Sequence, residues 1–213
     1  MFHHQGRTWC CLSDEWLTLF EAEGFTVAIF DCDGTLVDSM QAHLHAMQSA
    51  ALEQGHEMSP DWYARRTGLD RTSLFAEFQQ TVKGSFDVER AIVTSIECFY
   101  EISHLIRPIP AVLAFARSLQ RKGIPLAVAT NAERDVANAS LSAVNATALF
   151  DCVVSISDDV RPKPSPEMFE LAAHLLGLPP NKILVIEDSP QGVQAAISGG
   201  MSTIQLLEEN RPS

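Results

Sequence analysis

Four short apolar segments constrain the fold of this chain more strongly than any other feature. Each is β-branched or aliphatic and too short for a buried helix, which predicts a strand buried on both faces of a parallel sheet. The segments are 26–30, 124–129, 182–186 and 202–206, and 151–156 is a weaker fifth. Stretches with helical periodicity separate most of them. Strands that alternate with helices predict an open parallel α/β sheet.

One long stretch interrupts this alternation. Residues 39–107 contain no convincing strand. Their apolar positions instead recur at helical spacing, as in Met40, Leu44, Met47 and Ala51, which share one helix face. We therefore expect a helical insertion after the first strand, with Ile106 to Pro110 as the linker that leaves it.

Composition and charge exclude several classes of protein. A chain of 213 residues with 46% hydrophobic residues forms one to two domains with a sizeable core. The net charge of −12 argues against general binding of nucleic acid. No apolar run approaches the roughly 20 residues of a membrane span, and the start lacks the layout of a signal peptide. The five cysteines include no C-x-x-C pair, which is typical of a reduced cytoplasmic protein.

Polar residues follow the predicted strands at the end where such sheets bind ligands. These residues are Asp31 and Asp33 after the first strand, Thr130 and Asn131 after the second, Lys163 after the weak strand, and Glu187 and Asp188 after the next one.

The acidic members of this set indicate a metal site. Asp31, Asp33 and Asp188 supply oxygen ligands of the kind that Mg²⁺ prefers. Carboxylates gathered at one place repel each other, so their grouping implies a cation. The sequence therefore predicts Mg²⁺ as the cofactor.

The remaining members are suited to phosphate chemistry. Lys163 supplies a positive charge, and Thr130 and Asn131 can bind phosphate oxygens. A carboxylate nucleophile such as Asp31 can form an aspartyl-phosphate. Asp33 can protonate the leaving oxygen and then activate water.

Each of these residues alone has a structural explanation. Asp33-Gly34 is a common turn, Thr130-Asn131 can cap the following helix, and Asp188 precedes a helix start. Lys163, between two prolines, can be a solvated loop residue. The functional interpretation is favoured because the residues occur together, each at a strand end.

The segment Asp31-Cys32-Asp33-Gly34-Thr35-Leu36-Val37-Asp38-Ser39 resembles the first motif of the haloacid-dehalogenase superfamily. Thr130, Lys163 and Glu187-Asp188 match its other three motifs in order. The place of the insertion resembles the helical cap of the β-phosphoglucomutase-like subfamily. The resemblance covers about residues 26–207. It implies a Rossmann-like core from 26–38 and 108–213 and an all-helical cap from 39–107. Residues 1–25 lie outside the resemblance, and the apolar pattern of residues 14–23 predicts that they form an N-terminal helical extension.

The resemblance also implies a role for each matched residue. Asp31 is expected to be the nucleophile and a metal ligand, and Asp33 the general acid/base and a backbone metal ligand. Asp188 is expected to bind the metal directly, with Glu187 in its outer shell. The expected phosphate-binding residues are Thr130, Asn131 and Lys163.

Residues of the insertion are less constrained. His43 and Arg71 match positions that face the substrate in mutase-like members, although His43 can also lie on a polar helix face and Arg71 can be a helix-start residue beside Asp70. The pair Arg65-Arg66 is expected to be a solvated turn.

These features predict a Mg²⁺-dependent phosphatase for a small phosphorylated metabolite, such as a sugar phosphate. The alternatives are a phosphosugar mutase and a non-catalytic binder of a phosphorylated ligand. The mutase relatives carry cap cations, including a lysine on a later cap helix. Here Lys83 is the only lysine from 39 to 107, and the helix expected over 89–104 has Arg90 only at its start. Thr35 also resembles the phosphatase form of the first motif.

Overall fold

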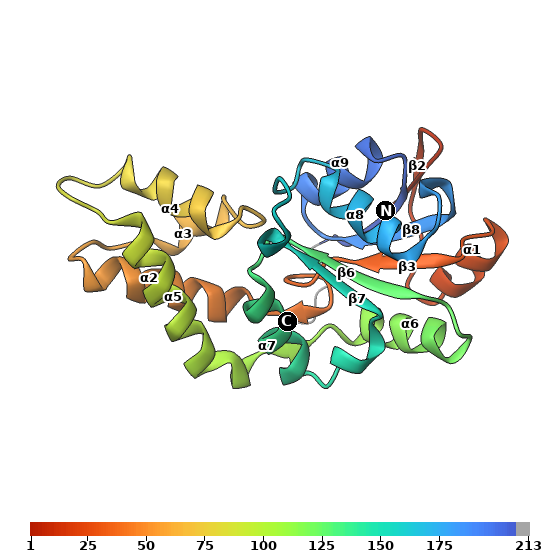
Figure 1. Ribbon diagram of the computed structural model, residues 1–213, viewed down its shortest axis with the longest axis horizontal. Coiled ribbons are helices and arrows are strands. Elements are labelled where there is room, and N and C mark those ends of the chain that lie inside the picture. The colour runs from red at the N-terminus through yellow and green to blue at the C-terminus, as the bar shows by residue number, and fades with distance from the viewer. Residues whose placement is uncertain (208–213) are drawn as a thin grey trace.

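The computed structural model describes residues 1–207, which form a helix-flanked sheet with a helical insertion beside it (Figure 1). The sheet has seven strands in the order β2-β1-β9-β8-β3-β6-β7. The five strands from β9 to β7 in this order are parallel. They are β3 (Val27–Phe30), β6 (Leu126–Thr130), β7 (Cys152–Ser155), β8 (Ile183–Glu187) and β9 (Ser202–Gln205). The predicted parallel sheet is therefore confirmed.

Helices cover both faces of the sheet because its central strands bury residues on both sides. In β3, Ala28 and Phe30 pack on one face, whereas Val27 and Ile29 pack on the other. The first face is covered by α1 (Trp16–Ala22), α6 (Pro110–Arg121) and α7 (Arg134–Ala143). The second face is covered by α8 (Glu167–Leu176) and α9 (Pro190–Ser198).

The N-terminal segment corrects one expectation. Residues 1–25 are expected to form a helical extension. α1 confirms the helix expected within 14–23, but β1 (Phe2–His4) and β2 (Arg7–Trp9) form a hairpin before it. β1 pairs antiparallel with β9, so the hairpin extends the main sheet. Its turn contains Gln5 and Gly6, both with positive φ, as a tight hairpin turn requires. Three-residue strands gain stability from their neighbours, and no local pattern reveals such a partner.

The insertion is helical, as expected. It contains α2 (Met40–Glu53), α3 (Pro60–Ala64), α4 (Arg71–Gln79) and α5 (Val88–Ile102). These helices share their own apolar cluster, which includes Met47, Phe75 and Phe86. We call residues 39–107 the cap and the rest of the described chain the core.

The two connections between cap and core lie side by side. β4 (Val37–Asp38) enters the cap, β5 (Arg107–Pro108) leaves it, and the two pair antiparallel. Short 3-10 helices complete the structure at Ser103–Leu105, Thr147–Leu149, Ile156–Asp158 and Pro180–Lys182. Over residues 1–207, no helix combines the length and apolar character that crossing a membrane requires.

Candidate active site

A cavity of about 310 Å³ lies between the cap and the carboxyl ends of the parallel strands, and residues of both line it. Strand pairing explains its position, because Phe30 of β3 is in register with Ile186 of β8 and Val128 of β6. The residues after these strands therefore meet at one edge of the sheet. All nine candidate residues from the sequence line the cavity: Asp31, Asp33, His43, Arg71, Thr130, Asn131, Lys163, Glu187 and Asp188.

Lys163 is buried among carboxylates. Its Nζ donates hydrogen bonds to Oδ1 of Asp31 over 2.7 Å and to Oε1 of Glu187 over 2.9 Å. It also lies 4.8 Å from the centre of the Phe169 ring, within the range of a cation–π contact. Burial by itself lowers the pKa of Lys163, but the two carboxylates outweigh burial and raise it. The ammonium group therefore stays charged at neutral pH.

More negative than positive charges surround Asp31. Burial raises the pKa of its carboxyl group well above the ordinary value. Lys163 opposes this shift, and the carboxylates of Glu187 and Asp188 add to it. One lysine therefore does not neutralise the whole acidic group.

A metal ion fits this arrangement. Asp31, Glu187 and Asp188 each offer a carboxylate oxygen, and the three oxygens lie within 4.8 Å of one another. Carboxylates are ligands for hard cations such as Mg²⁺, and a cation would offset their repulsion. These three residues could therefore hold a metal.

Gly34, which follows Asp33, allows the Asp188 carboxylate to lie close to the loop after β3. A Cβ atom at Gly34 would lie 2.3 Å from Oδ2 of Asp188, and the φ of Gly34 is +88°. Thr35 then donates from its hydroxyl to Oδ1 of Asp188 over 3.1 Å. Any larger residue at position 34 would displace the Asp188 carboxylate.

Asp33 has different partners from Asp31. Its Oδ1 accepts a hydrogen bond from the Ser39 hydroxyl over 2.6 Å and lies 3.1 Å from Nε2 of His43. Burial by itself raises the pKa of Asp33, but His43, Ser39 and Arg71 outweigh burial and lower it. The His43 ring stacks on Phe99, with 4.5 Å between the ring centres. His43 therefore lies in the site and not on a solvated helix face.

Thr130 and Asn131 organise the loops around the cavity. The Thr130 hydroxyl accepts a hydrogen bond from the backbone N–H of Ala132. The Asn131 side chain accepts from the backbone N–H of Lys163 and donates to the carbonyl of Gly68 in the cap, each over 2.9 Å. Their predicted contacts with phosphate stay predictions.

Arg71 connects the cap to the core. It is the first residue of α4, after the N-cap residue Asp70. Its Nε donates to the carboxylate of Glu133, with a shortest distance of 3.1 Å, and one terminal nitrogen donates to the Ser95 hydroxyl over 3.0 Å. Arg71 is thus a helix-start residue, as one alternative held, and it also lines the cavity.

Sequence reasoning missed two charged residues of the cavity, Glu133 and Arg66. Arg66 is expected to lie in a solvated turn, but it lines the cavity, lies 3.9 Å from the Trp62 ring centre and pairs with Glu77. Both residues owe their position to the way the cap lies over the core, which no motif records.

Comparisons with known proteins agree with this geometry. Residues 28–206 match the sequence model of a family described as haloacid dehalogenase-like hydrolase. The chain is 29% identical to hexitol phosphatase A of Escherichia coli, over 84% of this chain and 81% of that protein.

Solved structures show the same architecture. CbbY from Rhodobacter sphaeroides, in complex with phosphate, has a TM-score of 0.78 and 26% identity, covering 83% of this chain and 84% of that one. A putative β-phosphoglucomutase from Thermotoga maritima has a TM-score of 0.65 and 28% identity, covering 83% and 82%. The chain therefore belongs to the haloacid dehalogenase-like hydrolase family, in its β-phosphoglucomutase-like subfamily.

Proposed function

We propose that this protein is a Mg²⁺-dependent phosphatase that hydrolyses a small sugar phosphate through an aspartyl-phosphate on Asp31. The observation that carries the proposal is the convergence of Asp31, Lys163 and Asp188 in one cavity. A nucleophile, a fixed positive charge and a site suited to a metal are the parts that phosphoryl transfer requires. The named activity of the relative from E. coli supports the same reaction class.

Asp31 and Asp33 divide the chemistry between them. The Asp31 carboxylate attacks phosphorus, and the bond from phosphorus to the leaving oxygen breaks. Asp33 gives a proton to that oxygen, so it must be protonated in the substrate complex, although its pKa is lowered in the ligand-free site. It later takes a proton from the water that attacks the aspartyl-phosphate. Ser39 and His43, which contact the Asp33 carboxylate, hold it in position.

The negative charge of the phosphate requires compensation. Lys163 supplies a permanent positive charge beside Asp31. Asp31, Asp188 and the backbone of Asp33 would hold Mg²⁺, with Glu187 in its outer shell. When bound, Mg²⁺ supplies charge neutralisation for the phosphate oxygens. Thr130 and Asn131 would bind further phosphate oxygens.

The cap completes the site. The hydrogen bond from Asn131 to the Gly68 carbonyl and the ion pair of Arg71 with Glu133 join cap and core across the cavity. A closed cap excludes bulk water from the nucleophile. We propose His43 and Arg71 as the cap residues nearest the substrate.

The free state of all five cysteines supports a cytoplasmic location.

The test is a screen of phosphorylated metabolites with Mg²⁺, in which released phosphate is measured. We expect a subset of sugar monophosphates to be hydrolysed, with no release in the presence of a chelator. Asp31→Asn is the control for contaminating phosphatases. Release of phosphate at the same rate by Asp31→Asn would refute the proposal.

A further inference from the structure

Every basic side chain that lines the cavity already has a carboxylate partner, within the part of the chain that the structure describes. The pairs are Lys163 with Asp31 and Glu187, His43 with Asp33, Arg71 with Glu133, and Arg66 with Glu77. Lys163 and a metal can bind the phosphate that is transferred. The other pairs determine which further groups of a substrate can bind in the cavity.

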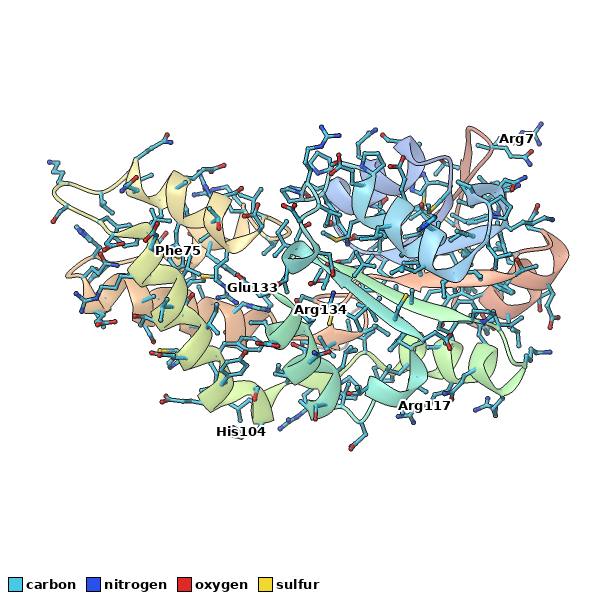
Figure 2. The ribbon with its side chains drawn as sticks, in the orientation of Figure 1. Arg7, Phe75, His104, Arg117, Glu133 and Arg134 are labelled. Atoms are coloured by element: carbon cyan, nitrogen blue, oxygen red, sulfur yellow. The ribbon has the colours of Figure 1, made fainter. Side chains whose placement is uncertain are left out.

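The pair of Arg71 and Glu133 is the most enclosed of those in which an arginine takes part. The Arg71 side chain is 3% exposed and that of Glu133 is 25% exposed. Nε of Arg71 lies 3.2 and 3.1 Å from the two oxygens of Glu133, and a terminal nitrogen is bound to Ser95. A buried guanidinium needs its counter-charge, so Glu133 holds Arg71 in place. Figure 2 shows Glu133 at the start of α7, where the core faces the cap.

The charges around the cavity disfavour a second phosphate group. Five carboxylates line it, against three arginine or lysine side chains. Lys83, the single lysine of the cap, is exposed and does not line the cavity. A second phosphate would therefore meet the carboxylate of Glu133 and an arginine that is already paired. Hydroxyl groups, in contrast, can donate to Glu133.

We propose that Glu133 determines substrate specificity: by pairing with Arg71, it selects monophosphate esters with an uncharged, hydroxyl-rich remainder and rejects bisphosphates. The inference rests on the proposed function and specifies its substrate class. Without the Glu133 carboxylate, the Arg71 guanidinium is available to bind a second phosphate, a ligand that its planar donors suit.

Glu133 is suited to substitution because it does not support its helix. It occupies the N-cap position of α7, but its side chain makes no capping hydrogen bond. Glu133→Gln keeps its size and removes its charge, and Glu133→Ser introduces a residue that favours the N-cap position. Glu53→Gln is the matched control, because it removes the partner of Arg90 on the cap surface, outside the cavity lining.

The experiment compares substrates that differ by one phosphate: fructose 1-phosphate with fructose 1,6-bisphosphate, and glucose 1-phosphate with glucose 1,6-bisphosphate. One readout is the ratio of kcat/KM values. The other is the ratio of Kd values, measured by calorimetry with Mg²⁺ in an Asp31→Asn background. We expect both ratios to shift toward the bisphosphate by about tenfold or more in Glu133→Gln and Glu133→Ser, as removal of a like charge predicts. Glu53→Gln should leave them unchanged.

Replacing Arg71 by Gln as well should abolish the gain, since Arg71 is the group that binds the second phosphate. A role of Glu133 in stability alone would change both substrates of a pair equally. Unchanged ratios in both Glu133 variants, or a wild type that prefers bisphosphates, would overturn the inference. If no ester is hydrolysed, the proposed function fails, and the Kd ratio still decides the role of Glu133.

Discussion

Lys163 donates a hydrogen bond to Oδ1 of Asp31 over 2.7 Å, although the two residues are 132 positions apart in the chain. The contact places a permanent positive charge beside the proposed nucleophile. Burial and two further carboxylates nevertheless keep the pKa of Asp31 raised. Asp33, two residues later, has a lowered pKa because its contacts with His43 and Ser39 outweigh burial. The two aspartates therefore have opposite effects on stability.

In the metal-free protein, Asp31→Asn should raise the free energy of unfolding at pH 7. The folded-state pKa of Asp31 lies above its ordinary value of 3.8, so the folded protein binds more protons than the unfolded chain between these two values. Stability is therefore lost as the pH rises through this window, and the Asp31 carboxyl group is a net cost to stability at pH 7. The gain in Asp31→Asn should shrink as the pH falls toward 3.8. Urea unfolding at several pH values measures it.

Asp33→Asn should lower the free energy of unfolding at pH 7, by about 1–3 kcal/mol for lost hydrogen bonds to a charged group. The folded-state pKa of Asp33 lies below 3.8, so its contribution is present above that pH and is lost as the pH falls through the folded value. The deficit should therefore disappear in acid. A destabilisation that is equal at pH 7 and pH 3 would contradict this assignment.

Mg²⁺ should stabilise the wild-type protein against heat. At a Mg²⁺ concentration about 100 times Kd, the expected stabilisation is about 2.7 kcal/mol, which raises the Tm. Asp188→Asn should lose most of this shift, because it removes one of the three gathered carboxylates. Asp14→Asn is the control, since Asp14 is exposed and lies outside the cavity lining. Equal shifts in the two variants would refute the metal site.

Phe2→Ala should destabilise the protein substantially. Phe2 is fully buried and is in register with Ile204 of β9. Removal of a buried phenylalanine side chain costs about 3–5 kcal/mol. Leu12→Ala, which truncates an exposed side chain nearby in the chain, should stay within about 0.5 kcal/mol of the wild type. Similar unfolding free energies for both variants would mean that the hairpin does not contribute to the sheet.

The parallel strands could be predicted from the sequence because strands buried on both faces have uninterrupted apolar runs. The structure places β3 at Val27–Phe30, within the expected 26–30, and β8 at Ile183–Glu187, one residue from the expected 182–186. The hairpin of β1 and β2 could not be predicted in this way. Its strands have three residues each, and β1 depends on β9, about 200 residues later.

The positions of the core site residues could be predicted because strand ends converge in a parallel sheet. Their chemical roles remain predictions. The partners contributed by the cap could not be predicted, since the approach of Arg71 to Glu133 depends on how two separately packed units meet. Glu133 carries no local signal except its place before α7, where its side chain makes no capping hydrogen bond.

With β-glucose 1-phosphate and a catalytic amount of glucose 1,6-bisphosphate, free phosphate should form faster than glucose 6-phosphate. A mutase must hold a bisphosphorylated intermediate, and the cavity offers no cation without a carboxylate partner among the described residues. Both products can be followed in one reaction by phosphorus NMR. Conversion to glucose 6-phosphate that is much faster than phosphate release would favour the mutase.

The central claim is that Asp31 becomes phosphorylated during turnover. The most direct measurement begins by mixing the enzyme with Mg²⁺ and a phosphate ester that it hydrolyses. The reaction is quenched with acid within milliseconds, and the peptides of the enzyme are analysed by mass spectrometry. We expect one phosphoryl group on the peptide that contains Asp31, its loss on treatment with hydroxylamine, and its absence in Asp31→Asn. A phosphoryl group on another residue, or phosphate release by Asp31→Asn at the wild-type rate, would contradict the account.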